Sequence, residues 1–185
     1  MNQLARLDGV ALSLHGVVLY QTQSVHDDRG SLGVVYRADW ALPLSVQWNL
    51  VASNANTLRG FHVHQHHADW LFAVGGQLSV GLLDMRLLSP TYRQSTVVDL
   101  TPFNGMLSIP PGVGHGFYNR GAATHCYATD EYWDPADEFA CRWDDPQLGI
   151  DWQAEDPLLS ERDRSAGSLA QMELLLAAAT PTEPD

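Results

Sequence analysis

Residues 105–119 read GMLSIPPGVGHGFYN, and within them Pro110, Gly112, His115 and Asn119 follow the spacing PxGxxHxxxN. The stretch contains two short β-rich runs, MLSIP and GFYN, which are separated by turn residues. Comparable runs recur along most of the chain without a helical pattern between them. Strands at this spacing indicate an all-β sandwich or barrel.

The other β-rich runs are also bounded by turn residues. They are GVVLY, SLGVVYRA, LSVQWNLV, WLFAV, QLSVGLLDMR, STVVDL and HCYATDEY. The pair GG separates WLFAV from QLSVGLLDMR and predicts a tight hairpin. Residues 160–179, SERDRSAGSLAQMELLLAAA, instead have a possible capping serine followed by helical periodicity. Because no repeat or linker is evident, we expect residues 1–185 to form a single domain with a short C-terminal helix.

The composition excludes several classes of protein. The chain has 185 residues, of which 45% are apolar, and a net charge of −12; all ten cationic side chains are arginine. An acidic surface without a basic run argues against non-specific binding to nucleic acid or anionic membranes, although a few arginines can still bind a small anion. Cys126 and Cys141 are not spaced as a metal or redox motif and fit a reducing compartment. No segment is long and apolar enough for a membrane span or a signal peptide, so we expect a cytoplasmic protein.

A second informative stretch, LRGFHVHQHHADW at residues 58–70, is rich in histidine. His62 and His64 are two apart, so on a strand both side chains lie on the same face. Asp69 opens the next predicted strand. The HxH pair, the short gap and the acidic residue, together with the PxGxxHxxxN stretch, resemble the two motifs of cupins, which are small jelly-roll barrels. The resemblance implies that four side chains point at one spot inside the barrel: His62, His64, Asp69 and His115.

Three imidazoles and a carboxylate form a reasonable ligand set for one divalent transition metal. For His64, metal ligation and a place in the core or pocket lining both stay open. His66 and His67 are expected in the connecting turn, either solvated or loosely facing a ligand. His125 alternates with Cys126 on a strand and is expected to serve packing rather than chemistry.

Further motifs narrow the family. In chain order they are DDRGSLGVVY, LRGFH, LDMRLLSPTY, SIPPGVGHGF, CYATDEYWDP, RWDDPQLGIDW and LLSERD. From about residue 17 to residue 164, the chain resembles the dTDP-4-dehydrorhamnose 3,5-epimerases. These are cupin isomerases that act on nucleotide-linked 4-keto-6-deoxy sugars, and the resemblance implies no cofactor. The run RWDDPQLGIDW followed by LSERD is specific to this branch, whereas the cupin histidines alone are not.

The resemblance implies proton transfer beside a ketone. A 4-ketone acidifies the hydrogens on C3 and C5, so an epimerase needs a base, an acid on the opposite face and a group that holds the enolate. By resemblance, His62 is the base, Asp163 orients it and stabilises its imidazolium, and Tyr127 is the acid. Without the resemblance, Tyr127 would be interpreted as a core tyrosine and Asp163 as a helix-start aspartate.

The resemblance also implies groups that bind the substrate. Arg59 would contact the diphosphate, because a guanidinium fork suits phosphate oxygens. Arg29 would reach the site of a partner subunit, because the family exchanges N-terminal strands in a homodimer. The other substrate-binding residues that the resemblance implies are Asn49, His115, Tyr132 and Trp133.

The chain departs from the family pattern at several positions. Asp69 replaces a lysine that helps to hold the enolate, His64 replaces an uncharged, non-ligating residue, and Val34 replaces an acidic residue. Two unit charges roughly 4 Å apart repel by about 4 kcal/mol at an effective dielectric near 20, which would slow the reaction about a thousandfold. Either Asp69 is protonated or turned away, or a metal bound by the four convergent side chains neutralises it. In the second case His62 cannot also be a free base.

Three functions therefore remain open. The primary hypothesis is an epimerase of a dTDP-linked 4-keto-6-deoxy sugar. The second is a metal-dependent cupin enzyme with a three-histidine, one-carboxylate site. The third is a sugar-nucleotide binder that has lost catalysis together with the lysine.

Overall fold

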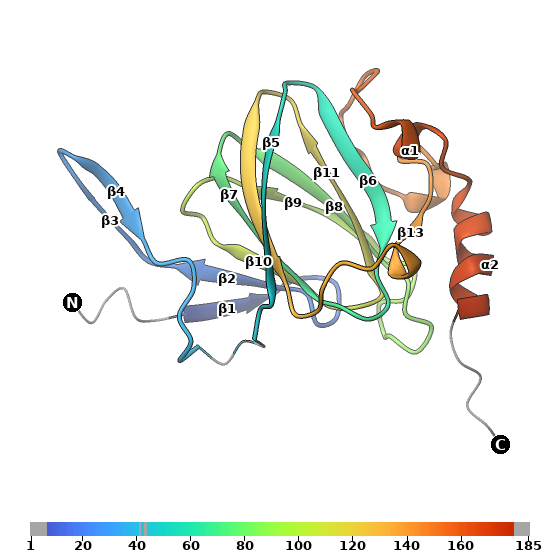
Figure 1. Cartoon of the computed structure of the whole chain (residues 1–185), viewed down its shortest axis with the longest axis horizontal. Helices are drawn as coiled ribbons and strands as arrows, with labels where there is room; N and C mark the ends of the chain where they lie inside the picture. The colour runs from blue at the N-terminus through green and yellow to red at the C-terminus, as the bar shows by residue number, and fades with distance from the viewer. Residues whose placement is uncertain (1–6, 41, 43, 180–185) are drawn as a thin grey trace.

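The computed structural model describes residues 7–40, 42 and 44–179 and contains two facing antiparallel sheets with a hairpin projecting to one side (Figure 1). The first sheet has the order β1 (Leu7–Ala11), β2 (Val18–Thr22), β10 (Met106–Ile109), β7 (Asp69–Gly75), β12 (Ala123–Thr129), β5 (Gln47–Ser53). The second has the order β13 (Phe139–Ala140), β6 (Thr57–Val63), β11 (Val113–Asn119), β8 (Leu78–Asp84), β9 (Ser95–Leu100). The hairpin is β3 (Ser24–Asp27) and β4 (Gly30–Gly33). The helical elements are η2 (Pro135–Asp137), η3 (Pro146–Leu148), α1 (Glu161–Arg164) and α2 (Leu169–Ala179).

The all-β prediction is confirmed, and aliphatic side chains fill the space between the two sheets. Leu71 and Leu107 from the first sheet share one core with Val80 and Leu82 from the second, and each is at most 1% exposed. Alternate residues of each strand point into this layer. Burial stabilises each such side chain by about 1.5–3 kcal/mol relative to exposure. Leu71 also lines the polar cavity described below, so the core supports that cavity.

The C-terminal segment covers the outer face of the second sheet, beside β6 and β13 (Figure 1). Phe61 and Leu83 of this sheet are buried in one cluster with Trp152, Leu169 and Met172. This packing holds α2, which carries Leu169 and Met172, against the sheet. The short helix α1 contacts β6, although the two elements are far apart in the sequence.

The helix predicted over residues 160–179 is two helices, α1 and α2. Ser160 caps α1 as expected, because its hydroxyl oxygen accepts a hydrogen bond from the backbone N–H of Asp163 at 3.0 Å. Between the helices, the carbonyl of Gly167 accepts the N–H of Arg142 at 2.7 Å. The backbone therefore leaves the helical path to bond to the neighbouring segment, which local periodicity does not reveal.

The predicted strands are present, with two corrections. SLGVVYRA is a strand only as far as Gly33, where β4 ends. The hairpin predicted at Gly75–Gly76 is wrong, because β7 pairs with β10 and β12 whereas β8 pairs with β9 and β11. The two strands bury their inner faces in one core from opposite sheets, so the glycine pair crosses between the sheets. The sequence analysis missed β1, β3 and β13.

A glycine at position 60 allows β6 to approach β11 closely. Gly60 has a φ of +116°, which residues with a side chain rarely adopt. A Cβ at this position would lie 2.7 Å from the Cα of Gly116. This approach accompanies a register in which His62 of β6 is the partner of His115 of β11. The glycine of the RGFH motif therefore helps to place His62.

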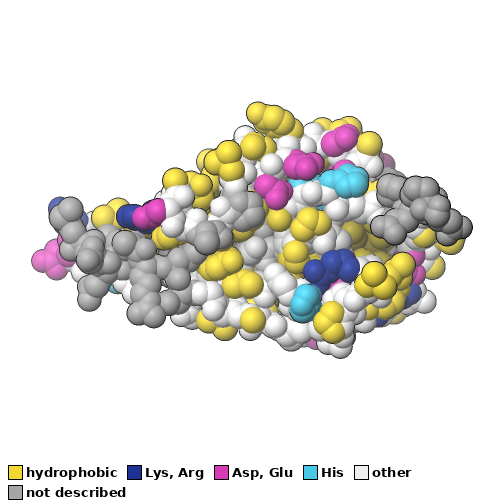
Figure 2. Space-filling view, turned by 90° about the horizontal axis from the view of Figure 1, so that it is seen from below, with side chains coloured by type: hydrophobic (Ala, Val, Ile, Leu, Met, Phe, Trp, Pro, Cys, Tyr) yellow, Lys and Arg dark blue, Asp and Glu magenta, His cyan; other side chains and the backbone are white. Residues whose placement is uncertain are grey.

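The surface view shows scattered hydrophobic side chains and few cationic ones on one face (Figure 2). This agrees with the net charge of −12. Within the described ranges, no helix is long and apolar enough to cross a membrane.

Candidate active site

A polar cavity of about 80 Å³ lies between the two sheets. The polar and aromatic residues that line it include His62, His64, His67, Asp69, His115, Tyr127, Trp133 and Glu138. His62 and His115 come from adjacent strands of the second sheet, whereas Tyr127 comes from β12 of the first. The structure thus brings together the four side chains that the cupin motifs place at one spot.

His62 and Asp163 form a close pair at this cavity. The Nε2 atom of His62 lies 2.7 Å from Oδ1 of Asp163, which is 5% exposed. The hydroxyl of Ser160 donates to the other carboxylate oxygen at 2.8 Å. Burial opposes ionisation of Asp163, but hydrogen bonds from His62, Ser160 and the backbone of Gly60 outweigh it and lower the pKa of the carboxyl. Asp163 is therefore an anion that orients the imidazole and stabilises its protonated form.

Glu138 faces the second ring nitrogen of His62, with 3.3 Å between Nδ1 and Oε1. Its carboxylate also pairs with Arg162 at 2.7 Å and accepts the indole N–H of Trp133 at 2.8 Å. Burial opposes ionisation, but these neighbours outweigh it and lower the pKa of Glu138. The sequence analysis missed this residue, because nothing in the acidic run DPADE shows which carboxylate turns inward.

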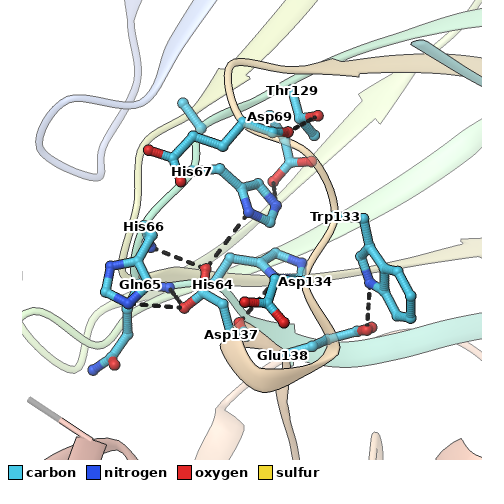
Figure 3. A network of polar contacts seen from close by, with 12 residues as sticks. His64, Gln65, His66, His67, Asp69, Thr129, Trp133, Asp134, Asp137 and Glu138 are labelled. Atoms are coloured by element: carbon cyan, nitrogen blue, oxygen red, sulfur yellow. Dashed lines mark hydrogen bonds and ion pairs between the residues drawn. The ribbon is translucent and has the colours of Figure 1, made fainter. Parts of the chain in front are cut away.

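A second polar group lies beside this pair and contains His64, His67 and Asp69 (Figure 3). One donor atom from each lies within 4.8 Å of the others, and all three residues are buried. His115 adjoins the group, with its Nε2 4.0 Å from Oδ2 of Asp69. The structure does not include His62 in this group, because both of its ring nitrogens face carboxylates; His67 takes the expected place of His62.

Of the two alternatives for His67, solvation is wrong, because the residue is only 4% exposed; it lines the cavity instead. Asp137 organises the turn by accepting the backbone N–H groups of Gln65 at 2.9 Å and His66 at 3.0 Å (Figure 3). The side chain of His66 is 63% exposed, as expected. A carboxylate about 70 positions later in the chain therefore turns one histidine inward and leaves its neighbour in solvent.

Burial keeps the group of His64, His67 and Asp69 mostly uncharged. Burial, and then the neighbouring imidazole of His67, lowers the pKa of His64 to about 4. Burial also lowers the pKa of His67. Burial, and then nearby acidic groups, raises the pKa of Asp69 to about 8. At neutral pH the two imidazoles are therefore neutral and Asp69 is mostly protonated.

Tyr127 lines the cavity from the sheet that faces His62. Its register partner on the edge strand β5 is Asn49. Burial raises the pKa of Tyr127, so the phenol keeps its proton at neutral pH. His125, two residues earlier on β12, is fully buried with its ring 4.8 Å from that of Phe117, which confirms the packing prediction.

The remaining predicted substrate-binding residues lie in different surroundings. Arg59 is exposed on β6, and its Nε donates to the hydroxyl of Ser53 at 3.1 Å. Trp133 lines the cavity and is 51% exposed, whereas Tyr132 is 74% exposed and does not line it. Arg29 lies in the turn of the projecting β3–β4 hairpin with a side chain that is 90% exposed (Figure 1). Arg29 is thus far from the cavity of its own chain.

A family model for dTDP-4-dehydrorhamnose 3,5-epimerase matches residues 11–171. This chain belongs to that family. A dTDP-4-dehydrorhamnose 3,5-epimerase from Pseudomonas aeruginosa is 34% identical over 170 residues, which cover 86% of this chain and 94% of the relative. Among solved structures, a 4-keto-6-deoxy sugar epimerase from the novobiocin biosynthetic gene cluster of Streptomyces spheroides has a TM-score of 0.85 and 31% identity, with 96% of this chain and 94% of that chain covered. A dTDP-6-deoxy-D-glucose-3,5-epimerase from Legionella pneumophila in complex with dTDP-4-keto-L-rhamnose has a TM-score of 0.84 and 26% identity, with 97% and 100% covered.

The epimerase resemblance of residues 17–164 is therefore confirmed, and the matched range extends slightly beyond it at both ends. The cupin jelly roll is confirmed as the fold of this 3,5-epimerase family member. The cavity beside the His62–Asp163 pair contains the residues that the resemblance assigned to proton transfer and is the candidate active site.

Proposed function

We propose that this chain inverts one or both carbons beside the ketone of a dTDP-linked 4-keto-6-deoxy sugar. The observation that carries the proposal is the 2.7 Å contact between His62 and Asp163 at a cavity lined from both sheets. An imidazole oriented by a buried carboxylate is suited to act as a general base at neutral pH.

The two proton transfers are assigned to facing sides of the cavity. His62 removes the hydrogen next to the ketone, and the anionic Asp163 stabilises the imidazolium that forms. Tyr127, which belongs to the facing sheet and keeps its proton, donates to the other side of the enolate. Inversion requires removal and return on opposite faces, and this arrangement supplies both from side chains of the chain itself. The proposed proton transfers therefore need no cofactor.

Asp69 is compatible with this reaction in its neutral form. As a carboxylate at roughly 4 Å, it would repel an enolate by about 4 kcal/mol at an effective dielectric near 20. Burial raises the pKa of Asp69 to about 8, so the ligand-free site at neutral pH mostly carries the uncharged acid. The repulsion expected from the lysine-to-aspartate replacement is then largely removed.

Substrate binding is assigned to residues around the cavity. Arg59 is proposed to bind the diphosphate with the guanidinium nitrogens that do not contact Ser53. His115 and Trp133 line the cavity and are proposed to contact the sugar. Asn49 beside Tyr127 is proposed to contact the sugar nucleotide as well. The exposed ring of Tyr132 is proposed to stack on the nucleotide outside the cavity.

We further propose a homodimer formed through the first sheet. On its edge strand β5, Trp48 and Leu50 are 43% and 74% exposed, and on the hairpin Val25 and Leu32 are 45% and 62% exposed. Edge strands and clustered exposed apolar side chains favour association with another chain. In such a dimer the hairpin can carry Arg29 to the partner's cavity.

The proposed function is tested by incubating the protein with dTDP-4-keto-6-deoxy-D-glucose and following the sugar protons by NMR. Signals of a C3 or C5 epimer are expected with the wild-type protein and not with His62→Asn. Tight binding of the sugar nucleotide with no epimer formed would instead support the binder hypothesis.

A further inference from the structure

We propose that His64, His67 and Asp69 bind one divalent transition-metal ion inside the barrel, next to the His62–Asp163 pair. Their donor atoms already lie within 4.8 Å of one another. Ligand atoms at about 2.1 Å from a tetrahedral ion are roughly 3.4 Å apart, so the donor atoms need to approach one another by up to about 1.4 Å. Rotation of side chains supplies movements of that size without a change in the strands.

The contacts around the two histidines favour this role. Nδ1 of His64 lies 3.3 Å from the backbone oxygen of Asp137, and Nδ1 of His67 lies 3.5 Å from its carboxylate. Histidine ligands of metals commonly donate one ring N–H to a carbonyl or carboxylate, which leaves the other nitrogen for the ion. Nε2 of His67 points toward Asp69, with 3.7 Å to Oδ2 (Figure 3). Asp137 therefore contacts one nitrogen of each imidazole, but the two rings are stacked with centroids 4.2 Å apart and 29° between their planes, so one ring has to turn before both can bind the same ion.

The surroundings of Asp69 also favour the binding of a cation. Its residue is 5% exposed, and two imidazoles face its carboxylate. Its nearest polar neighbours are the ring nitrogens of His67 at 3.7 Å and His115 at 4.0 Å. A buried carboxylate is costly unless it is paired, and a metal ion held between it and the imidazoles would pair it.

The donor set and the space define the class of ligand. Imidazole and carboxylate donors suit Zn²⁺, Fe²⁺, Co²⁺ and Ni²⁺ rather than Ca²⁺ or Mg²⁺. The cavity of about 80 Å³ accommodates an ion and one or two waters, since a water occupies about 30 Å³. His115 is close enough to Asp69 to become a fourth ligand.

The role of the ion rests on the proposed function, whereas its binding does not. Asp69 stands where the family resemblance expects the lysine that holds the enolate. A bound divalent ion would restore positive charge at that place and polarise the substrate oxygen. His62 is not among the ligands, so the ion does not compete with its proposed role as the base.

Binding is tested without substrate on protein that carries no histidine tag and has been dialysed against a chelator. Co²⁺ is titrated into the wild-type protein and followed by its visible absorption, and Zn²⁺ is then added as a competitor. The test variants are Asp69→Asn, which keeps the shape of the side chain, and His67→Ala. His66→Ala is the matched control, because it removes an exposed imidazole from the same turn. Circular dichroism in the presence of chelator establishes that each variant is folded.

The proposal predicts one Co²⁺ per chain, displaced by Zn²⁺, in the wild-type protein and His66→Ala. The affinity for Co²⁺ should fall at least tenfold in Asp69→Asn and His67→Ala. Zn²⁺ should raise the Tm of the wild-type protein and His66→Ala but not of these two variants. Binding that survives in Asp69→Asn, or that is lost equally in His66→Ala, would overturn the site. If His67→Ala does not fold, Asp69→Asn decides the outcome.

Epimer formation is measured separately on the same samples with and without Zn²⁺. Metal binding without epimer formation in any sample would leave the metal site standing and refute the proposed function. Epimer formation at the same rate with and without bound Zn²⁺ would refute the role of the ion.

Discussion

Replacing Asp163 with asparagine removes the negative charge of the side chain and keeps its shape. The carboxylate is 2.7 Å from Nε2 of His62, and the centres of the two delocalised charges are about 4 Å apart. At an effective dielectric near 20, that pair is worth about 4 kcal/mol, or about a thousandfold in rate. Asparagine can still form a hydrogen bond to the ring, so we expect kcat to fall between about 100-fold and 1000-fold. KM should change little, because Asp163 is buried behind the imidazole.

Glu138→Gln is the matched comparison, because it removes the other carboxylate that faces His62. Its contact with the ring is longer, at 3.3 Å, and Arg162 at 2.7 Å already neutralises much of its charge. We expect kcat to fall less than about tenfold. Both variants are assayed by the NMR appearance of the epimer at saturating substrate, after circular dichroism has established folding. A loss in Glu138→Gln as large as that in Asp163→Asn would refute the assignment of the orienting role to Asp163.

Further predictions concern stability, assembly and substrate binding. Asp84→Asn should lower the free energy of unfolding by about 3 kcal/mol, because the fully buried Asp84 loses its charged bond to Arg86. Burial opposes ionisation of Asp84, but its hydrogen bonds hold its pKa below the ordinary value. The stability of the wild-type protein should therefore decline as the pH falls below about 4. Urea unfolding at several pH values should show a weaker decline in Asp84→Asn. Leu50→Arg should convert the proposed dimer to a monomer in light scattering, and an unchanged mass would contradict the proposed interface. Arg59→Ala should raise KM about tenfold or more with a smaller change in kcat; a reversed pattern would argue against a phosphate contact.

The sequence predicted well what depends on local periodicity. The cupin resemblance correctly placed His62 and His64 among the cavity-lining residues, although β6 ends at Val63 and His64 lies just beyond the strand. The PxGxxHxxxN motif likewise placed His115 on a strand beside the cavity, next to His62. Asp163 lies 101 residues from His62, so no local pattern joins them, and only the family resemblance predicted their contact.

The failures arose where distant parts of the chain decide the conformation. The turn with His67 looks solvated in the sequence, but Asp137 binds its backbone from a separate segment and turns the histidine inward. Glu138 was missed because it is one of several acidic residues in a short run. The pair Gly75–Gly76 indicates a turn, but the sequence of a turn does not reveal whether the next strand pairs in the same sheet or in the other one.

The most direct test of the account is uptake of solvent deuterium by dTDP-4-keto-6-deoxy-D-glucose in D₂O, with wild-type protein and His62→Asn compared. Asparagine keeps a polar side chain at the position but cannot act as the base. The account predicts that the wild-type protein incorporates deuterium at C3, at C5 or at both, and that His62→Asn incorporates it at least 1000-fold more slowly. Equal incorporation by the two proteins, or none by a folded wild-type protein, would contradict the claim that His62 removes a proton beside the ketone.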